Sequence, residues 1–134
     1  MKVLALDYGS ARTGVAVSDA TATLARPLGV VERAGSDTGL ARLAEIVRSE
    51  GVDHIVVGLP VTLRGERGAQ VDETERFVAS LEAAVDVPVD TWDERFTTRL
   101  AAASLANGAR ADEDALAAAH LLTSYLEWLS ATRT

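Results

Sequence analysis

The segment LALDYGSARTGVAVSD, residues 4–19, carries the first side chain whose chemistry stands out, that of Asp7. An apolar run leads to this carboxylate, a glycine-rich turn follows at once, and a second apolar run begins at Val15. The pattern predicts a strand, a tight turn and a strand, with the acid at the end of the first strand. A buried carboxylate is costly unless a partner compensates its charge. We therefore expect a metal ion beside Asp7.

Further carboxylates occupy two distant places in the chain. Asp93 and Glu94, in TWDERFTT, end the last predicted strand, and Asp114 lies in the first turn of the last predicted helix. Ligands of α/β sheets bind outside the carboxyl ends of the strands, so we expect these acids to converge on Asp7 there. Carboxylates without His or Cys suit the hard cations Mg²⁺ and Mn²⁺. Such ions assist phosphodiester hydrolysis.

Each of these acids also has an ordinary structural explanation. Glu94 equally fits a solvent-exposed strand exit that pairs with Arg95. Asp93 fits a turn former or a residue that supports the site from outside it. Asp114 fits a helix start, where the helix dipole favours acids, as do its neighbours Asp112 and Glu113. The residues alone leave the role of Asp114 open.

The elements that must position these acids follow from periodicity and breakers. We expect strands at 3–7, 14–18, 24–31, 53–58 and 87–92, and helices at 37–50, 71–84, 97–106 and 112–129. Ser36 is the expected N-cap of the first helix and Gly51 its stop. We expect a loop at residues 60–70 and fraying of the chain from Ser130. The order β-β-β-α-β-α-β-α-α predicts an α/β fold with a mixed five-stranded sheet: a three-strand antiparallel meander plus two parallel strands, with helices on both faces.

Composition narrows the class of protein. The chain has 134 residues, of which 48% are hydrophobic, which suits one globular domain spanning residues 1–134. It contains no Cys, which excludes disulfides and thiolate zinc sites. No apolar run approaches the roughly 20 residues that span a bilayer, and the first residues do not resemble a signal peptide. We expect a cytoplasmic location and no membrane partner.

The formal net charge of −7 argues against nucleic-acid binding through a uniformly basic surface. Twelve of the 13 basic residues are arginines, however, and several fall in predicted loops near the acids. Guanidinium groups match phosphate geometry well. The candidate contacts to a nucleic-acid backbone are Arg12, Arg64, Arg67 and Arg95. A plain polar loop around Arg64 and Arg67, and an Arg95–Asp93 ion pair, are the alternatives.

Four segments occur in a fixed order over nearly the whole chain: LDYGSARTGVAVSD, VVGLPVTLRGERG, DERFTT and DALAAAHLLTSYL. Together they resemble the YqgF family of RNase H-like nucleases, whose members are named both as pre-16S rRNA nucleases and as Holliday-junction-resolvase homologues. The resemblance implies an RNase H-like fold and a metal-dependent nuclease. It assigns Asp7, Glu94 and Asp114 as catalytic metal ligands. This sequence lacks one basic residue of the family's first turn and has its own loop after Pro60.

The resemblance implies hydrolysis of structured nucleic acid by Mg²⁺ or Mn²⁺, and it favours the 5′ end of precursor 16S rRNA over a branched DNA junction. Two other classes remain as alternatives. An actin-like nucleotide-binding module has a similar first strand but needs two lobes around its nucleotide. A non-catalytic RNA-binding factor would carry the acids without using them. Resolvases of this kind commonly act as homodimers, which makes a dimer an expectation from the resemblance.

Overall fold

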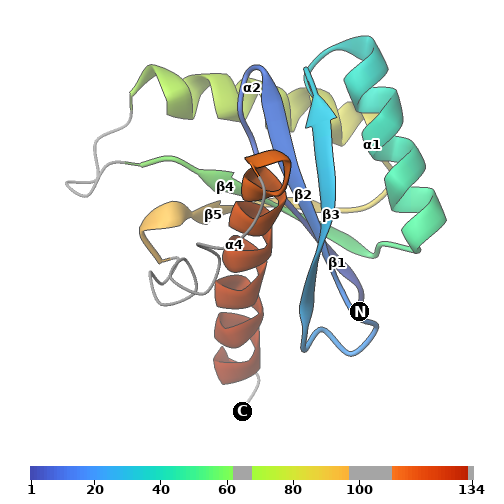
Figure 1. The fold of residues 1–134 in the computed structure, drawn as a ribbon, viewed down its shortest axis with the longest axis vertical. Helices are drawn as coiled ribbons and strands as arrows, with labels where there is room; N and C mark the ends of the chain where they lie inside the picture. The colour runs from blue at the N-terminus through green and yellow to red at the C-terminus, as the bar shows by residue number, and fades with distance from the viewer. Residues whose placement is uncertain (62–67, 97–109, 133–134) are drawn as a thin grey trace.

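The computed structural model describes residues 1–61, 68–96 and 110–132. In this part of the chain, five strands form one mixed sheet in the order β3-β2-β1-β4-β5 (Figure 1). The strands are β1 (Val3–Asp7), β2 (Arg12–Ser18), β3 (Ala25–Glu32), β4 (His54–Leu59) and β5 (Val89–Asp93). β1, β2 and β3 pair antiparallel, whereas β4 pairs parallel to β1 and β5 parallel to β4. The predicted meander with two added parallel strands is confirmed.

Helices cover both faces of this sheet. Helices α1 (Asp37–Glu50) and α2 (Ala69–Ala84) pack on one face, and α4 (Arg110–Thr132) packs on the other (Figure 1). Because both faces are covered, the central residues of the parallel strands β1 and β4 are apolar and buried, as in other buried parallel strands. Val3 to Leu6 of β1 are all fully buried. None of the helices described here is long and apolar enough to cross a membrane.

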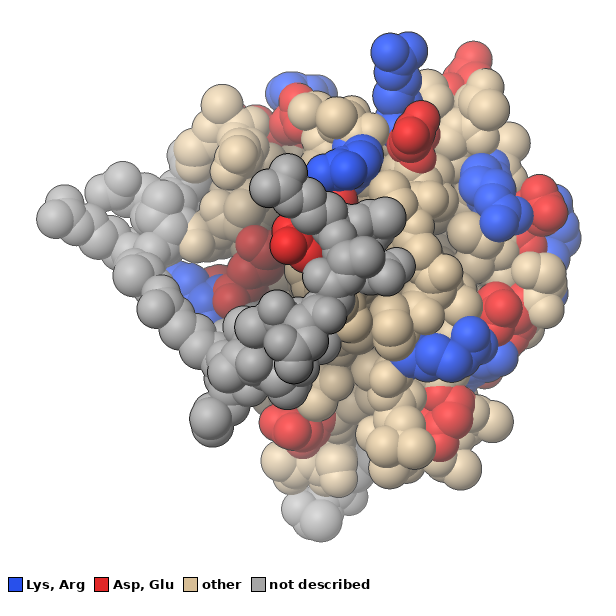
Figure 2. Space-filling view, viewed as in Figure 1, with Lys and Arg blue, Asp and Glu red and all other residues tan. Residues whose placement is uncertain are grey.

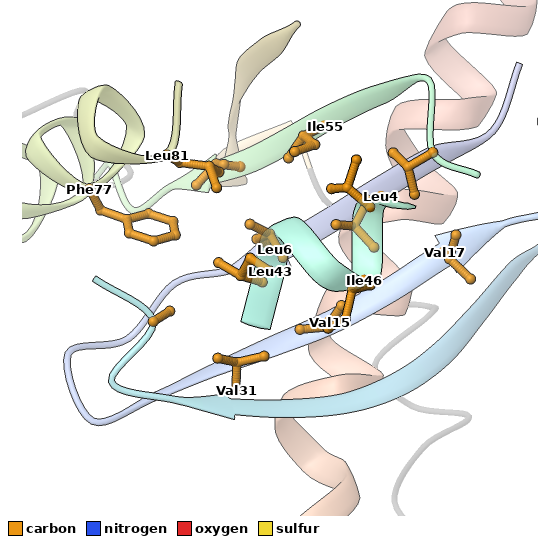
Figure 3. Close-up of a cluster of buried hydrophobic side chains, with 14 of the residues drawn as sticks. Leu4, Leu6, Val15, Val17, Val31, Leu43, Ile46, Ile55, Phe77 and Leu81 are labelled. Atoms are coloured by element: carbon orange, nitrogen blue, oxygen red, sulfur yellow. The ribbon is translucent and has the colours of Figure 1, made fainter. Parts of the chain in front are cut away.

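Two apolar layers hold the helices to the sheet. The larger one lies between the sheet and helices α1 and α2, where side chains of β1 and β2 meet both helices (Figure 3). Its labelled members include Leu4, Leu6, Val15, Val17, Leu43, Ile46, Phe77 and Leu81. The second layer lies under α4, where Leu121, Leu122 and Tyr125 pack on Ala5 and Val56. Small residues on the sheet side of this layer let α4 lie close to β1 and β2.

Helix α1 begins and ends where its sequence signals predict. The Ser36 hydroxyl accepts a hydrogen bond from the Gly39 N–H at 3.0 Å, which caps the first turn. Gly51 closes the helix with φ 66°, a left-handed conformation that glycine adopts without strain. The caps therefore fix this element locally, before any tertiary contact is considered.

Several boundaries differ from the prediction. β2 begins at Arg12 because the antiparallel ladder continues to the Arg12–Glu32 pair. α2 begins at Ala69, two residues early. The expected fraying from Ser130 is wrong for residues 130–132: α4 continues to Thr132, whose hydroxyl donates to the Leu129 carbonyl at 3.1 Å, and residues 133–134 lie outside the described residues. The predicted helix at 97–106 and residues 62–67 of the predicted loop lie outside the described residues.

Candidate active site

The carboxyl ends of β1 and β5 bring two of the predicted acids together. Asp7 is the last residue of β1. β5 ends at Asp93, and Glu94 opens the short 3-10 turn η1 (Glu94–Phe96), so Glu94 follows the strand rather than ending it. Since β1, β4 and β5 run parallel, their carboxyl ends open on the same edge of the sheet. There the side chains of Asp7 and Glu94 form a hydrogen bond with each other.

The Asp7–Glu94 pair holds a proton at neutral pH when no cation is present. Burial is the main reason why the pKa of Glu94 rises to about 8, and the hydrogen bond with Asp7 and the charges of Asp7 and Asp93 raise it further. The pKa of Asp7 is also raised, first by burial and then by the negative charge of Asp114. The bond to Glu94 acts in the opposite direction on Asp7, so protonated Glu94 donates to the Asp7 carboxylate.

Asp114 reaches the same edge of the sheet from the face that α4 covers, because α4 crosses β2 at Gly14. The Asp114 carbonyl occupies the space where a Cβ on Gly14 would be. Gly14 is in turn the residue of β2 that pairs with Asp7 of β1. The backbone of Asp114 therefore lies over the direct neighbour of Asp7. Its carboxylate acts on Asp7 through charge, as the raised pKa of Asp7 shows.

Arg12 balances the charge of Asp114. The Arg12 Nε atom lies 3.2 Å from Asp114 Oδ2 in an ion pair, while more than half of the Arg12 side chain stays exposed. Oδ2 itself is buried, and no donor among the described residues reaches it with hydrogen-bond geometry. A buried carboxylate oxygen in this condition has unused capacity for a cation.

The donor set fits a hard divalent cation, although the three acids do not yet enclose one. Within residues 1–61, 68–96 and 110–132, no three His or acidic side chains are gathered tightly enough to bind one ion. Asp7 and Glu94 touch, and Asp114 faces Arg12. All the oxygens belong to carboxylates, which Mg²⁺ and Mn²⁺ prefer. A cation would replace the proton between Asp7 and Glu94 and compete with Arg12 for Asp114.

A cavity of about 270 Å³ opens beside Asp7 and Glu94. Its other walls come from the turn after β1 and the first turns of α2, including Tyr8 and Glu73. The Tyr8 ring stacks on Phe77 with centroids 4.4 Å apart, and its hydroxyl donates to Glu73. No sequence pattern points to Glu73, because only the packing of α2 brings that residue to β1.

Of the other three candidate arginines, only Arg95 lies in the described part of the chain. Arg95 donates from Nη2 to Asp93 Oδ2 at 2.6 Å and from Nε to both oxygens of that carboxylate. This bond lowers the pKa of Asp93, and it confirms the ion-pair alternative for Arg95. Arg64 and Arg67 lie outside the described residues. Acidic and basic side chains are interspersed on the visible face, without a separate basic patch (Figure 2).

Trp92, on β5 just before these acids, is buried and belongs to the core rather than to an open base-stacking surface. It meets Tyr125 edge-on with centroids 5.5 Å apart. Trp128 and Phe96 extend this aromatic group toward solvent, and both are at least half exposed. The aromatic group thus anchors β5 to α4 next to the site.

Comparisons with known proteins show which chains this one is similar to. The RuvX family model, described as Holliday junction resolvase, matches residues 1–128. A protein of Rubrobacter xylanophilus named "Putative pre-16S rRNA nuclease" is 47% identical, over 94% of this chain and 92% of its own. A protein of the same name from Chloroflexus aurantiacus is 40% identical, over 93% of this chain and 86% of its own.

Solved structures share the fold at low sequence identity. RuvC of T. thermophilus, in complex with a Holliday junction substrate, superposes with a TM-score of 0.64 at 20% identity, covering 96% of both chains. The Fowlpox virus resolvase, in a complex with Holliday junction DNA, gives 0.60 at 12% identity, covering 96% of this chain and 99% of its own. These likenesses confirm the RNase H-like fold. With the family model and the curated relatives, they show that the chain belongs to the RuvX family, the YqgF family of the sequence resemblance.

Proposed function

We propose that this protein is a divalent-metal-dependent endonuclease that cuts structured RNA at the 5′ end of precursor 16S rRNA in the cytoplasm. The observation that carries the proposal is the proton-sharing pair of Asp7 and Glu94, with Asp114 beside it, at the carboxyl ends of parallel strands. Buried carboxylates that repel each other are expensive to maintain, and a bound cation relieves that expense. The names of the curated relatives support rRNA as the substrate.

The positions of the acids support a role for each of them in binding the metal. Asp7, Glu94 and Asp114 would hold Mg²⁺ or Mn²⁺, which when bound polarises the phosphate and activates water for attack. Glu94 must first release its proton, and Asp114 must share its buried oxygen between Arg12 and the ion. The arginines Arg12, Arg64, Arg67 and Arg95 would neutralise the phosphates of the substrate. Arg12 can turn from Asp114 to a phosphate because more than half of its side chain is exposed.

The cavity beside Asp7 and Glu94 gives the substrate a way in. It is open to solvent between the turn after β1 and the start of α2, and its volume of about 270 Å³ suits part of one nucleotide. A scissile phosphodiester entering there would meet both carboxyl groups at once. The larger body of the RNA would lie outside, over the edge of the sheet.

The test compares the wild-type protein with Asp7→Asn on labelled precursor 16S rRNA. Cleavage should require Mg²⁺ or Mn²⁺, stop on chelation and fall to background in Asp7→Asn. Asp86→Asn is the matched control, because Asp86 is an exposed acid in the connection between α2 and β5. Cleavage that persists in chelator or in Asp7→Asn would rule out this mechanism.

Branched DNA is the second candidate substrate. The family model is described as Holliday junction resolvase, and two fold neighbours are complexes with junction substrates. A synthetic four-way junction therefore forms the second arm of the experiment, with light scattering to measure the oligomeric state. Paired cuts in the junction by a dimer, with precursor rRNA left intact, would favour the resolvase. Metal-independent RNA binding without cleavage would favour a non-catalytic factor.

A further inference from the structure

Asp7 is flanked by glycines on both neighbouring strands. Gly14 of β2 pairs directly with Asp7, and Gly58 of β4 follows Val57, which pairs with Leu6. Both glycines are buried, and neither has a positive φ. The backbone conformation therefore does not require glycine at these two positions. What they provide is space on either side of the first metal-ligand candidate.

At Gly14 the space is filled by the backbone of α4. A Cβ at this position would overlap the carbonyl group of Asp114 and would lie 3.1 Å from the backbone nitrogen of Ala115. Since main-chain atoms cannot avoid a clash by changing rotamer, the whole first part of α4 would have to move. Any such movement carries the carboxylate of Asp114 away from Asp7.

At Gly58 the space is filled by side chains, one of which belongs to the site. A Cβ there would come within 2.7 Å of Glu94 Oε1 and 3.1 Å of Glu94 Cγ, and would overlap Leu121 Cδ1. The Glu94 side chain thus crosses the bare backbone of Gly58. Both contacts are with movable side chains, so the fold can absorb a methyl group here. Glu94 can absorb it only by changing its own position.

We infer that Gly14 and Gly58 are positioning residues of the metal site: the side chains they lack let Asp114 and Glu94 approach Asp7 from its two sides. The inference rests on the proposed function for the identity of the bound ion. It extends that function from the three acids to the strand positions that set their spacing. It also explains why two glycines occupy buried strand positions, where glycine normally weakens a sheet.

The test measures Mn²⁺ binding to the full chain without nucleic acid, by the electron paramagnetic resonance signal of free Mn²⁺. Gly14→Ala should weaken binding by on the order of tenfold or more, as does loss of other groups that orient metal ligands. Gly39→Ala is the matched control. Its Cβ would also overlap a backbone carbonyl, that of Arg33, and would lie 2.6 Å from the Cα of Ala34. Gly39 lies in α1, so its substitution should lower thermal stability and leave Mn²⁺ affinity unchanged.

Gly58→Ala separates the site from the packing. The variant should bind Mn²⁺ about tenfold more weakly while staying folded by circular dichroism. Adding Leu121→Ala removes the clash with Leu121 but not the one with Glu94. The double variant should therefore remain weak in Mn²⁺ binding. Recovery of wild-type affinity in the double variant would show that Gly58 acts only through Leu121, which would overturn its assignment.

The outcomes distinguish this inference from the proposed function. Wild-type affinity in folded Gly14→Ala and folded Gly58→Ala would overturn the inference and leave the nuclease proposal standing. Wild-type protein that binds Mn²⁺ but cuts no RNA would overturn the nuclease proposal and leave the inference standing. If Gly14→Ala does not fold, the Gly58→Ala variants decide the matter alone. No Mn²⁺ binding by the wild-type protein would overturn the assignment of both glycines.

Discussion

The proton shared by Asp7 and Glu94 ties the stability of the metal-free protein to pH. The pKa of Glu94 is about 8 in the folded protein, above its ordinary value of 4.5. The folded state therefore binds more protons than the unfolded state between these values. The stabilisation of the folded state by this extra proton is complete at acid pH and is lost as the pH rises toward 8. At neutral pH, the metal-free site therefore stabilises the folded protein less than it does at acid pH.

Substitution of Glu94 by Gln should remove this dependence, because an amide cannot ionise. In chelator, Glu94→Gln should match wild type near pH 4.5 and be more stable at pH 8. The gain should be roughly 2 kcal/mol, well below the full value of the pKa shift, because water partly screens the pair. Urea denaturation at several pH values measures the difference. A difference that does not change with pH would contradict the shared proton.

Metal affinity should depend on pH for the same reason. A cation can bind only after Glu94 loses its proton, so the dissociation constant of Mn²⁺ should fall about tenfold per unit between pH 6 and 8. Above the pKa of about 8 the constant should level off. Calorimetry in buffers of different ionisation enthalpy should count about one proton released per ion at pH 7. Proton-free binding at that pH would show that the pair is already ionised.

Residues whose side chains carry the chemistry could be predicted from the sequence. Residues that matter because they leave room for a neighbouring group could not. Asp7 stands out because an apolar run ends on a carboxylate, and the predicted meeting of Asp7 with Glu94 is confirmed. The role of Asp114 as a ligand stays a prediction. Gly14 looks like an ordinary strand residue until α4 is seen to cross it. The sequence pattern does not indicate which helix will cross which strand.

At the scale of elements, local signals fix α1 and long-range pairing fixes the rest. Ser36 and Gly51 mark both ends of α1 in the sequence. The sequence pattern does not predict that β2 begins at Arg12, because only the ladder with β3 extends the strand into the glycine-rich turn. The predicted range 112–129 is also shorter than α4 for a similar reason. The last residues of α4 continue a helix whose position depends on packing against β1, β2 and β3.

Loss of the α1 cap should reduce stability without touching the site. Ser36→Ala removes the oxygen that receives the Gly39 N–H, and should lower the free energy of unfolding by about 1 kcal/mol. Ser36→Gly, a much better N-cap than alanine, should lower it by only a few tenths of a kcal/mol. Urea denaturation and Mn²⁺ titration of both variants measure the two effects. A change in Mn²⁺ affinity would mean that α1 is coupled to the opposite layer.

For the molecule as a whole, the net charge of −7 limits how it can bind nucleic acid. Arg12 and Arg95, the described arginines among the candidate contacts, are already paired with Asp114 and Asp93. Acidic and basic groups are mixed over the visible face (Figure 2). Within the described part of the chain, attraction to phosphate would then come from bound cations and from arginines that change partner.

RNA affinity should accordingly depend on divalent ions more than on monovalent salt. Fluorescence anisotropy with a labelled precursor RNA and the wild-type protein, in Ca²⁺ or in chelator, tests this without relying on cleavage. Chelation should weaken binding at least about tenfold. Between roughly 50 and 200 mM salt, the decrease in affinity should correspond to the release of fewer than about three counterions. A basic protein that contacts many phosphates releases about six or more. A steep slope in chelator would reveal a basic surface beyond the described residues.

The order in which the acids occur along the chain bears on how the protein is made. Asp7 lies on the first strand, whereas Asp114 lies on α4, which packs on one face of the sheet. A ribosome releases residues in sequence, at about 5–20 per second. During synthesis, the nascent chain therefore exposes Asp7 for several seconds before its last companion emerges. The three candidate ligands can therefore come together only after α4 has been synthesised.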